Sequence, residues 1–214
     1  MAALIPPRAP DTPACLIDLS PHYNAPLTTT WHTEAYDHAR GRTNDLSSLP
    51  QGIQRLGGVA FDVRGVVQLA IRDWPGRYPT NVCGIRVGLA CQRLHFLHST
   101  GWYATNGVTI GRYIVHYADG RRREIPICYG EDVLDWWMMD AERKQAPHRA
   151  VTAWQGPNTA TAARGLEVRL FRSTWENPEP ETPIATLDFE TTLTYAAPFL
   201  VAITADSANA SETK

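Results

Sequence analysis

The sequence predicts an all-β protein with the architecture of an antiparallel sandwich or jelly roll. Short apolar runs recur along the whole chain, and several alternate apolar with polar residues at the period of two that strands require. Turn-forming Gly, Pro, Asn and Asp residues separate these runs at short intervals. Long helical periodicity is almost absent, and only one short helical segment is expected. These three observations favour two packed β-sheets.

A length of 214 residues fits one large all-β domain. Residues 1–13 are rich in proline and are expected to form a linker or a disordered lead. Residues 14–205 form the predicted β-sandwich domain. Residues 206–214 are small and polar, which predicts a disordered tail.

The first half of the domain begins with a predicted strand at residues 14–19. Residues 20–57 form an irregular segment, and a connection of this length is usually functional or folded over the edge of the core. Residues 58–71 alternate around Arg64-Gly65 and predict a tight hairpin.

The chain is organised around residues 93–120, where two predicted strands and three histidines come together. Alternation in the first strand places Leu94, Phe96 and His98 on one face. It places His95 and Leu97 on the other face, so the two histidines point apart.

Asp119-Gly120 predicts the turn of a hairpin between strands at residues 111–118 and 122–128. Residues 130–140 are the one segment with helical spacing and are expected to be a short helix or an ordered loop. The remaining predicted strands are residues 82–89, 150–154, 166–171, 184–192 and 199–204.

Composition argues against two classes of partner. The formal net charge is −2, and the only dense basic run is residues 121–123 beside a turn, so we expect no nucleic-acid binding. No apolar run reaches 18 residues, so we expect no membrane insertion. The four cysteines lack metal or redox spacing and are expected to be buried free thiols, with a Cys83–Cys91 bridge left open as an alternative.

Seven Trp and eight Tyr are many for this length, and they must be buried or displayed for binding. Sugars bind in water through flat aromatic faces, with a few polar groups that fix the hydroxyls. For each tryptophan taken alone, core packing is the more common role. Trp102 is the best candidate for exposure because it lies among turn-forming residues. The candidate ligand-binding residues are Trp74, Tyr78, Trp102, Tyr103, Asp132, Asp135, Trp136 and Trp137.

A metal site, or a hydrolase that depends on one, would have to use the neighbourhood of His95, His116 and Asp119. Zinc needs three such nitrogens, or two and a carboxylate, on one side of a sheet, and alternation allows at most one of His95 and His98 to join His116. Satisfied histidines at sheet positions are the more common outcome. The sequence contains no GxSxG, HExxH or glycine-rich phosphate loop, which weakens the hydrolase interpretation.

The order of GVAFDVRGVVQLA, IRVGLACQRLHFLHSTGW, IGRYIVHYADG, EIPICYGEDVLDWW and RLFRSTWENPEPETPIATLDFET resembles that of galactose-binding-like β-sandwich accessory domains of bacterial multidomain proteins. The resemblance covers residues from about 14 to 205 and implies ligands held by loops at one end of a jelly roll, often with a structural calcium ion. The available oxygen ligands, Asp119, Glu131, Asp132 and Asp135, do not follow the spacing of a calcium loop.

We therefore expect a non-catalytic module that binds a glycan or a glycan-like surface without a catalytic cofactor. If the chain belongs to a larger exported protein, it would be secreted or held at the cell surface, in contact with other domains. A structural or protein-interaction domain is the first alternative. A hydrolase near His95, His116 and Asp119 is the second.

Overall fold

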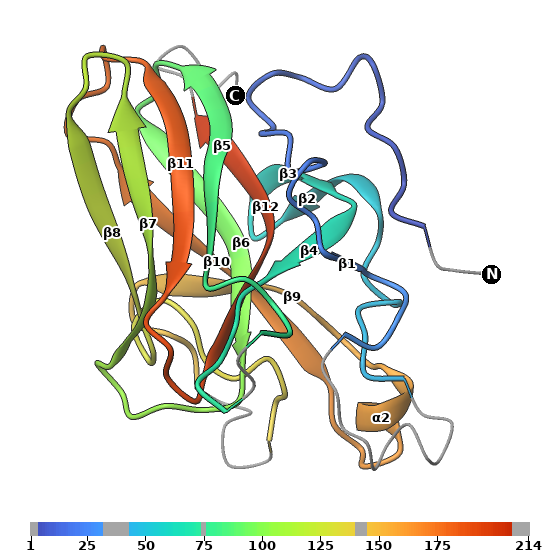
Figure 1. Ribbon diagram of the computed structural model, residues 1–214. Helices are drawn as coiled ribbons and strands as arrows, with labels where there is room; N and C mark the ends of the chain where they lie inside the picture. The colour runs from blue at the N-terminus through green and yellow to red at the C-terminus, as the bar shows by residue number, and fades with distance from the viewer. Residues whose placement is uncertain (1–3, 32–42, 74–75, 140–144, 207–214) are drawn as a thin grey trace.

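The computed structural model describes residues 4–31, 43–73, 76–139 and 145–206. These residues form two antiparallel sheets that pack face to face, with a smaller two-stranded sheet beside them (Figure 1). The prediction of an all-β sandwich is confirmed, and the arrangement is compatible with a jelly roll. Within the described residues, no helix has the length and apolarity needed to cross a membrane.

The larger sheet has six strands in the order β1-β4-β12-β6-β10-β9, and every neighbouring pair is antiparallel. In that order the strands are Ala25–Pro26, Gly65–Gln68, Ala197–Asp206, Arg93–Gly101, Val168–Glu176 and Ala150–Gly156. The smaller sheet has the order β5-β11-β7-β8. Its strands are Asn81–Leu89, Ile184–Thr191, Thr109–Tyr117 and Arg122–Cys128.

The main core lies between these two sheets. Phe96 of β6 stacks on Tyr113 of β7 with ring centroids 4.0 Å apart, and Tyr113 stacks in turn on Phe189 of β11 at 5.0 Å. Leu94 and Phe96 belong to this core, whereas Leu97 belongs to a second core on the opposite face of β6. The period-two prediction for this strand is therefore confirmed.

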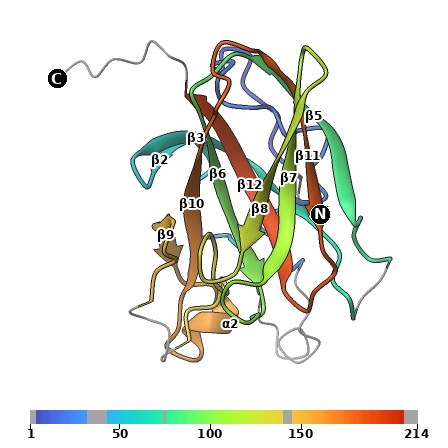
Figure 2. The ribbon, with the colours of Figure 1, turned by 90° about the vertical axis from the view of Figure 1, so that its left-hand side faces the viewer.

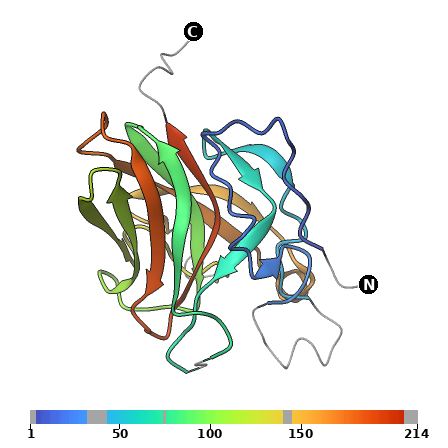
Figure 3. The ribbon, with the colours of Figure 1, turned by 45° about the horizontal axis from the view of Figure 1, so that its top comes forward.

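The second core makes the larger sheet a central layer. Residues of the N-terminal half, including Trp31 and Leu46, pack with Phe199 of β12 on the face that points away from the smaller sheet. Figure 3 shows this N-terminal segment in blue beside β12. Because β12 is covered on both faces, its sequence is apolar almost throughout and does not alternate.

The hairpin predicted over residues 58–71 is wrong. β3 (Val59–Val63) pairs with β2 (Gly52–Leu56), whereas β4 pairs with β1 and β12 in the larger sheet, so the chain changes sheets at Arg64. The true hairpin turns at Gly57 and Gly58, whose φ angles of 55° and 87° suit a two-glycine turn. The predicted hairpin between β7 and β8 is confirmed, with Gly120 in its turn.

The one described helix is α2, which spans Thr159–Ala162 and is capped by Asn158. Residues 130–139, where the helix was expected, are instead an ordered connection. Its backbone bonds to the ends of strands: Trp136 N–H donates to Thr100 O, and Trp137 forms a bridge with Val168. These bonds use backbone groups that a helix would have paired internally.

Part of the predicted lead packs on the domain. Arg8 donates to Asp62 at 2.9 Å, and the same carboxylate oxygen accepts from Arg64. Asp206 ends β12, and the rest of the predicted tail lies outside the described residues. All four cysteines are free thiols, as predicted, but only Cys91 is buried, whereas Cys15 and Cys128 are half-buried and Cys83 is exposed.

Three connections meet at one end of the sandwich. The strand registers pair Gly101 with Ala197, Thr109 with Cys128, and Gly111 with Thr191. The connections at residues 102–108, 129–149 and 192–196 therefore start or finish at the same edge, which lies at the bottom of Figure 2. This edge, the loop end, carries most of the predicted binding residues.

Candidate functional site

A cavity of about 230 Å³ opens at the loop end. Segments far apart in the sequence supply its walls, because the connections after β6 and β8 meet the N-terminal segment and the turn after α2 there. We call this cavity the tryptophan pocket. Its lining includes Asn44, Trp102, Asp135, Trp136, Trp137 and Arg164.

Four of the eight predicted ligand-binding residues thus line one cavity. Trp102 follows β6 directly, whereas Asp135, Trp136 and Trp137 lie in the connection between β8 and β9. The structure brings these residues together although more than thirty positions separate Trp102 from the other three. The aromatic and carboxylate groups required of a sugar site are present side by side.

Hydrogen bonds hold Trp137 in place. Its indole N–H donates to Asn44 Oδ1 at 3.0 Å, and its backbone N–H donates to Asp135 Oδ1 at 3.1 Å. The amide of Asn158 donates to the same Asn44 oxygen at 3.1 Å. The Arg164 guanidinium lies 4.7 Å from the centre of the Trp137 ring, which is within the range of a cation–π interaction.

Trp136 has a different role from Trp137. It is only 2% exposed and packs in the second core, edge to face with Phe199. Trp137 is half-buried and therefore offers more of its ring surface to a ligand than Trp136 does. Trp137 also packs against the second core, so both tryptophans connect the pocket wall to that core.

The rim of the pocket continues into exposed aromatic rings. Trp102 lies 5.7 Å from Tyr195, and Tyr195 lies 6.2 Å from Tyr103, between ring centroids. Tyr103 is 68% exposed, the most open aromatic side chain among the described residues. Trp102 and the nearby Leu193 both have left-handed backbones, with φ of 58° and 55°. Such strain in non-glycine residues gathers at functional sites.

Two of the predicted binding residues lie outside the tryptophan pocket, and a third lies outside the described residues. Tyr78 packs against the second core, and its hydroxyl donates to Trp31 O at 2.9 Å. Asp132 is buried and accepts from the backbone N–H of Cys128, which makes it a turn-forming residue. Trp74 lies outside the described residues.

The histidine and aspartate candidates for a metal site are distributed over the fold. His95 lies on the larger sheet and bonds to Thr174, whereas His116 lies on the smaller sheet and pairs with Asp188. Asp119 sits in the β7–β8 turn and binds Arg121, and this hydrogen bond lowers the pKa of Asp119. Across the described part of the chain, no three His, Cys, Asp or Glu side chains gather in a way that could hold a metal ion.

The available calcium ligands are also divided. The turn that holds Asp119 lies at one end of β8, while Glu131, Asp132 and Asp135 follow the other end. In the basic run beside this turn, Arg121 and Arg123 both pair with Glu179. These ion pairs neutralise part of the only dense positive charge in the sequence.

Sequence reasoning did not find several residues of the site. Asn44 lies in the irregular N-terminal segment, and Arg164 follows a helix that was not predicted. Tyr195 and Leu193 lie between two strands with no marked turn signal. Only the position of Asn44 carried a hint, because a long irregular segment is often functional.

No protein-family model matches the chain, and no curated protein matches it.

Proposed function

We propose that this protein is a non-catalytic binding module that holds carbohydrate in the tryptophan pocket. One observation carries the proposal: Trp102 and Trp137 come from separate connections and line a single cavity with Asp135 and Arg164. An indole face can stack on the apolar side of a pyranose, while carboxylate, amide and guanidinium groups bond to its hydroxyls.

The exposed rings beside the pocket support an extended ligand. Tyr195 lies next to Trp102, and the more exposed Tyr103 lies next to Tyr195. A row of aromatic side chains can contact successive sugar units of a chain. The position of this row at the loop end agrees with the galactose-binding-like sandwiches that the sequence resembles, in which loops at one end hold the ligand.

The proposal is tested with a glycan array, followed by affinity electrophoresis with each glycan that binds. We expect Trp102→Ala and Trp137→Ala each to weaken binding at least about tenfold, since central aromatic residues dominate binding energies. Ile53→Ala is the control, because it removes a large exposed apolar side chain from β2, outside the loop end.

The same experiment judges the alternative of a protein-interaction domain. If no glycan binds the folded protein, or if binding survives in both tryptophan variants, carbohydrate recognition at this pocket is excluded. The exposed apolar side chains at the loop end, Leu193 and Tyr103 among them, would then favour a protein partner.

A further inference from the structure

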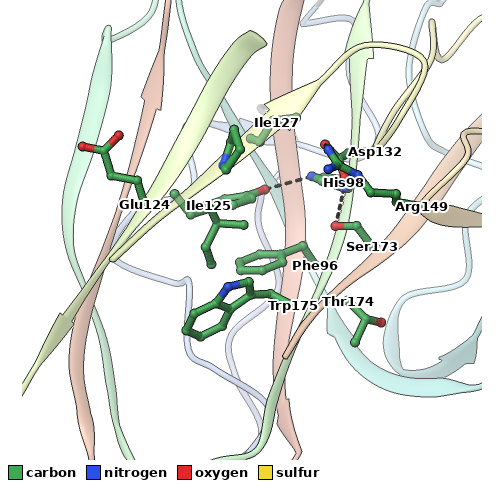
Figure 4. A pocket seen from close by; sticks show the side chains of 12 residues that line it. Phe96, His98, Glu124, Ile125, Ile127, Asp132, Arg149, Ser173, Thr174 and Trp175 are labelled. Carbon is green, nitrogen blue, oxygen red and sulfur yellow. Dashed lines mark hydrogen bonds and ion pairs between the residues drawn. The ribbon is translucent and has the colours of Figure 1, made fainter. Parts of the chain in front are cut away.

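A second cavity, of about 190 Å³, lies between the two sheets where β8 faces β10 (Figure 4). We call it the histidine pocket, because it reaches His98 of β6 at its inner end. It shares no lining residue with the tryptophan pocket. Its walls include Phe96, His98, Ile125, Ile127, Ser173 and Trp175.

His98 links two hydroxyl groups through its two ring nitrogens. Nδ1 lies 3.0 Å from the hydroxyl oxygen of Tyr113, and Nε2 lies 2.9 Å from Ser173 Oγ. Figure 4 shows the Ser173 side chain pointing at the imidazole. Burial lowers the pKa of His98 to about 3, so the ring is neutral at pH 7.

Counting protons shows that this cluster has one hydrogen-bond donor to spare. A neutral imidazole carries one N–H and one bare nitrogen, and each hydroxyl carries one proton. One hydroxyl must donate to the bare nitrogen, and the ring N–H must donate to the other hydroxyl oxygen. Three protons therefore serve two hydrogen bonds. The second hydroxyl keeps its own proton, for which the described residues provide no acceptor.

The geometry favours Ser173 as the residue with the spare proton. Both residues line the cavity, but Tyr113 is 1% exposed and stacked between two phenylalanines, whereas Ser173 is 9% exposed. A buried donor without an acceptor costs free energy. Water can accept this proton in the free protein. However, one water fills only about 30 Å³, and the walls of the remaining space include the apolar side chains of Phe96, Ile125 and Trp175.

Charge and size define the ligand. The lining holds two carboxylates, Glu124 and Asp132, and one guanidinium, Arg149, which is bound to Asp132 at 2.8 Å. An anion would find only Arg149 as a positive charge, and this side chain is already paired with Asp132. A cation would leave the spare hydroxyl proton without an acceptor. A cavity of about 150 Å³ with apolar walls can hold benzene. The histidine pocket, at about 190 Å³, is larger than such a cavity and can hold a ring with a polar substituent.

We propose that the histidine pocket binds a small, neutral, flat molecule that directs a carbonyl or hydroxyl oxygen at the hydroxyl of Ser173. The ring of the ligand lies among Phe96, Trp175 and the isoleucines of β8, and its oxygen accepts the spare proton. This site is independent of carbohydrate binding at the loop end, and either site can fail alone.

Benzamide and toluene are the matched probes, since both carry a six-membered ring and only benzamide has an acceptor oxygen. Each is titrated into the ¹⁵N-labelled full chain while amide resonances are followed by NMR. We expect benzamide to bind with a Kd of roughly 1 mM, typical for a ligand of this size, and to shift amides of β6, β8 and β10. Toluene should bind about 3- to 10-fold more weakly, because it forms no hydrogen bond.

Ser173→Ala is expected to weaken benzamide binding about 3- to 10-fold and to remove most of its advantage over toluene. The donor left in that variant is the ring N–H of His98, which lies deeper, at the inner end of the pocket. Ser99→Ala is the control, because it removes a buried hydroxyl that donates to Leu134 O and does not line the pocket.

Equal affinity for the two probes in the unmodified protein would overturn the proposal without any variant. Undiminished benzamide binding in folded Ser173→Ala would also overturn it, as would shifts confined to the loop end or the absence of saturable shifts.

Discussion

Trp102 packs its indole ring against Tyr195, with the ring centroids 5.7 Å apart and the planes inclined at 48°. The contact joins two connections with strained backbones, since Trp102 and Leu193 both occupy the left-handed region. Each costs about 1–2 kcal/mol relative to an ordinary backbone conformation. These two residues therefore lower the stability of the fold where the tryptophan pocket meets its aromatic rim.

Leu193→Gly is expected to stabilise the protein. Glycine removes the left-handed strain of about 1–2 kcal/mol and loses about 0.5–1 kcal/mol through its greater freedom in the unfolded chain. The difference is a net gain between zero and about 1.5 kcal/mol, which should raise the Tm by up to about 4 °C, measured by calorimetry. Val108→Gly is the control, because Val108 is also exposed at the loop end but lacks a positive φ, and this change should lower the Tm. A lower Tm for Leu193→Gly would contradict the strain argument.

His98 is expected to make the protein acid-sensitive. Its pKa is about 3 in the folded state because of burial, against about 6.5 in the unfolded chain. Between these values the unfolded chain binds a proton that the folded protein does not. The stabilising effect of a neutral His98 is therefore complete above pH 6.5. It is lost as the pH falls toward 3, by up to about 1.4 kcal/mol per pH unit.

Urea unfolding at pH 7, 6, 5 and 4 measures this effect. Other groups also titrate in this range, so the informative quantity is the difference in slope between the unmodified protein and His98→Gln, which cannot take up the proton. The variant should be less stable at pH 7 and lose less stability on acidification. Parallel pH profiles would show that His98 is protonated in the folded state.

Arg8→Ala is expected to lower the free energy of unfolding by about 1.5–3 kcal/mol, the range for hydrogen bonds to charged groups. Arg8 shares the buried Asp62 carboxylate with Arg64 and donates to the carbonyl of Leu16. Chemical denaturation measures the change. Arg55→Ala, an exposed arginine on β2, should change stability by less than about 0.5 kcal/mol. Equal stability of both variants would make residues 1–13 the dispensable linker that the sequence predicts.

The thiols should react with a disulfide reagent in a fixed order. Cys83 is exposed and should be modified first in the native protein. Cys91 is buried, and burial together with the charge of Asp206 raises its pKa to about 11, so it should react only after unfolding. Spectrophotometric thiol titration follows both phases. Cys83→Ser should remove the fast phase and leave the slow phase unchanged, whereas rapid reaction of Cys91 would contradict its burial.

Sequence patterns predicted the parts of the fold that local rules govern. The alternation of Leu94, Phe96 and Leu97 determines which face each residue covers, and Asp119-Gly120 sets the β7–β8 turn. The failure at residues 58–71 has a physical cause. Alternation identifies strands but does not identify their partners, and Gly57-Gly58 was the turn signal that mattered.

The candidate site was predictable only in part. Turn residues around Trp102 indicated that it would lie in a loop, and the carboxylate of Asp135 lay close in sequence to Trp137. Asn44 and Arg164 join them only through the tertiary fold. Ser173 and His98 likewise belong to different strands, and only the strand register, which pairs Ser173 with Phe96, places them diagonally next to each other.

Asn44 connects the N-terminal segment, which packs on the larger sheet, to the tryptophan pocket. Its side-chain oxygen accepts hydrogen bonds from Trp137 in the pocket and from Asn158 beside α2. Any ligand that needs Trp137 in this orientation therefore binds best when the N-terminal layer is docked on the sheet. By thermodynamic linkage, the same ligand must tighten that docking. Ligand binding should then slow amide hydrogen exchange in the segment that carries Asn44.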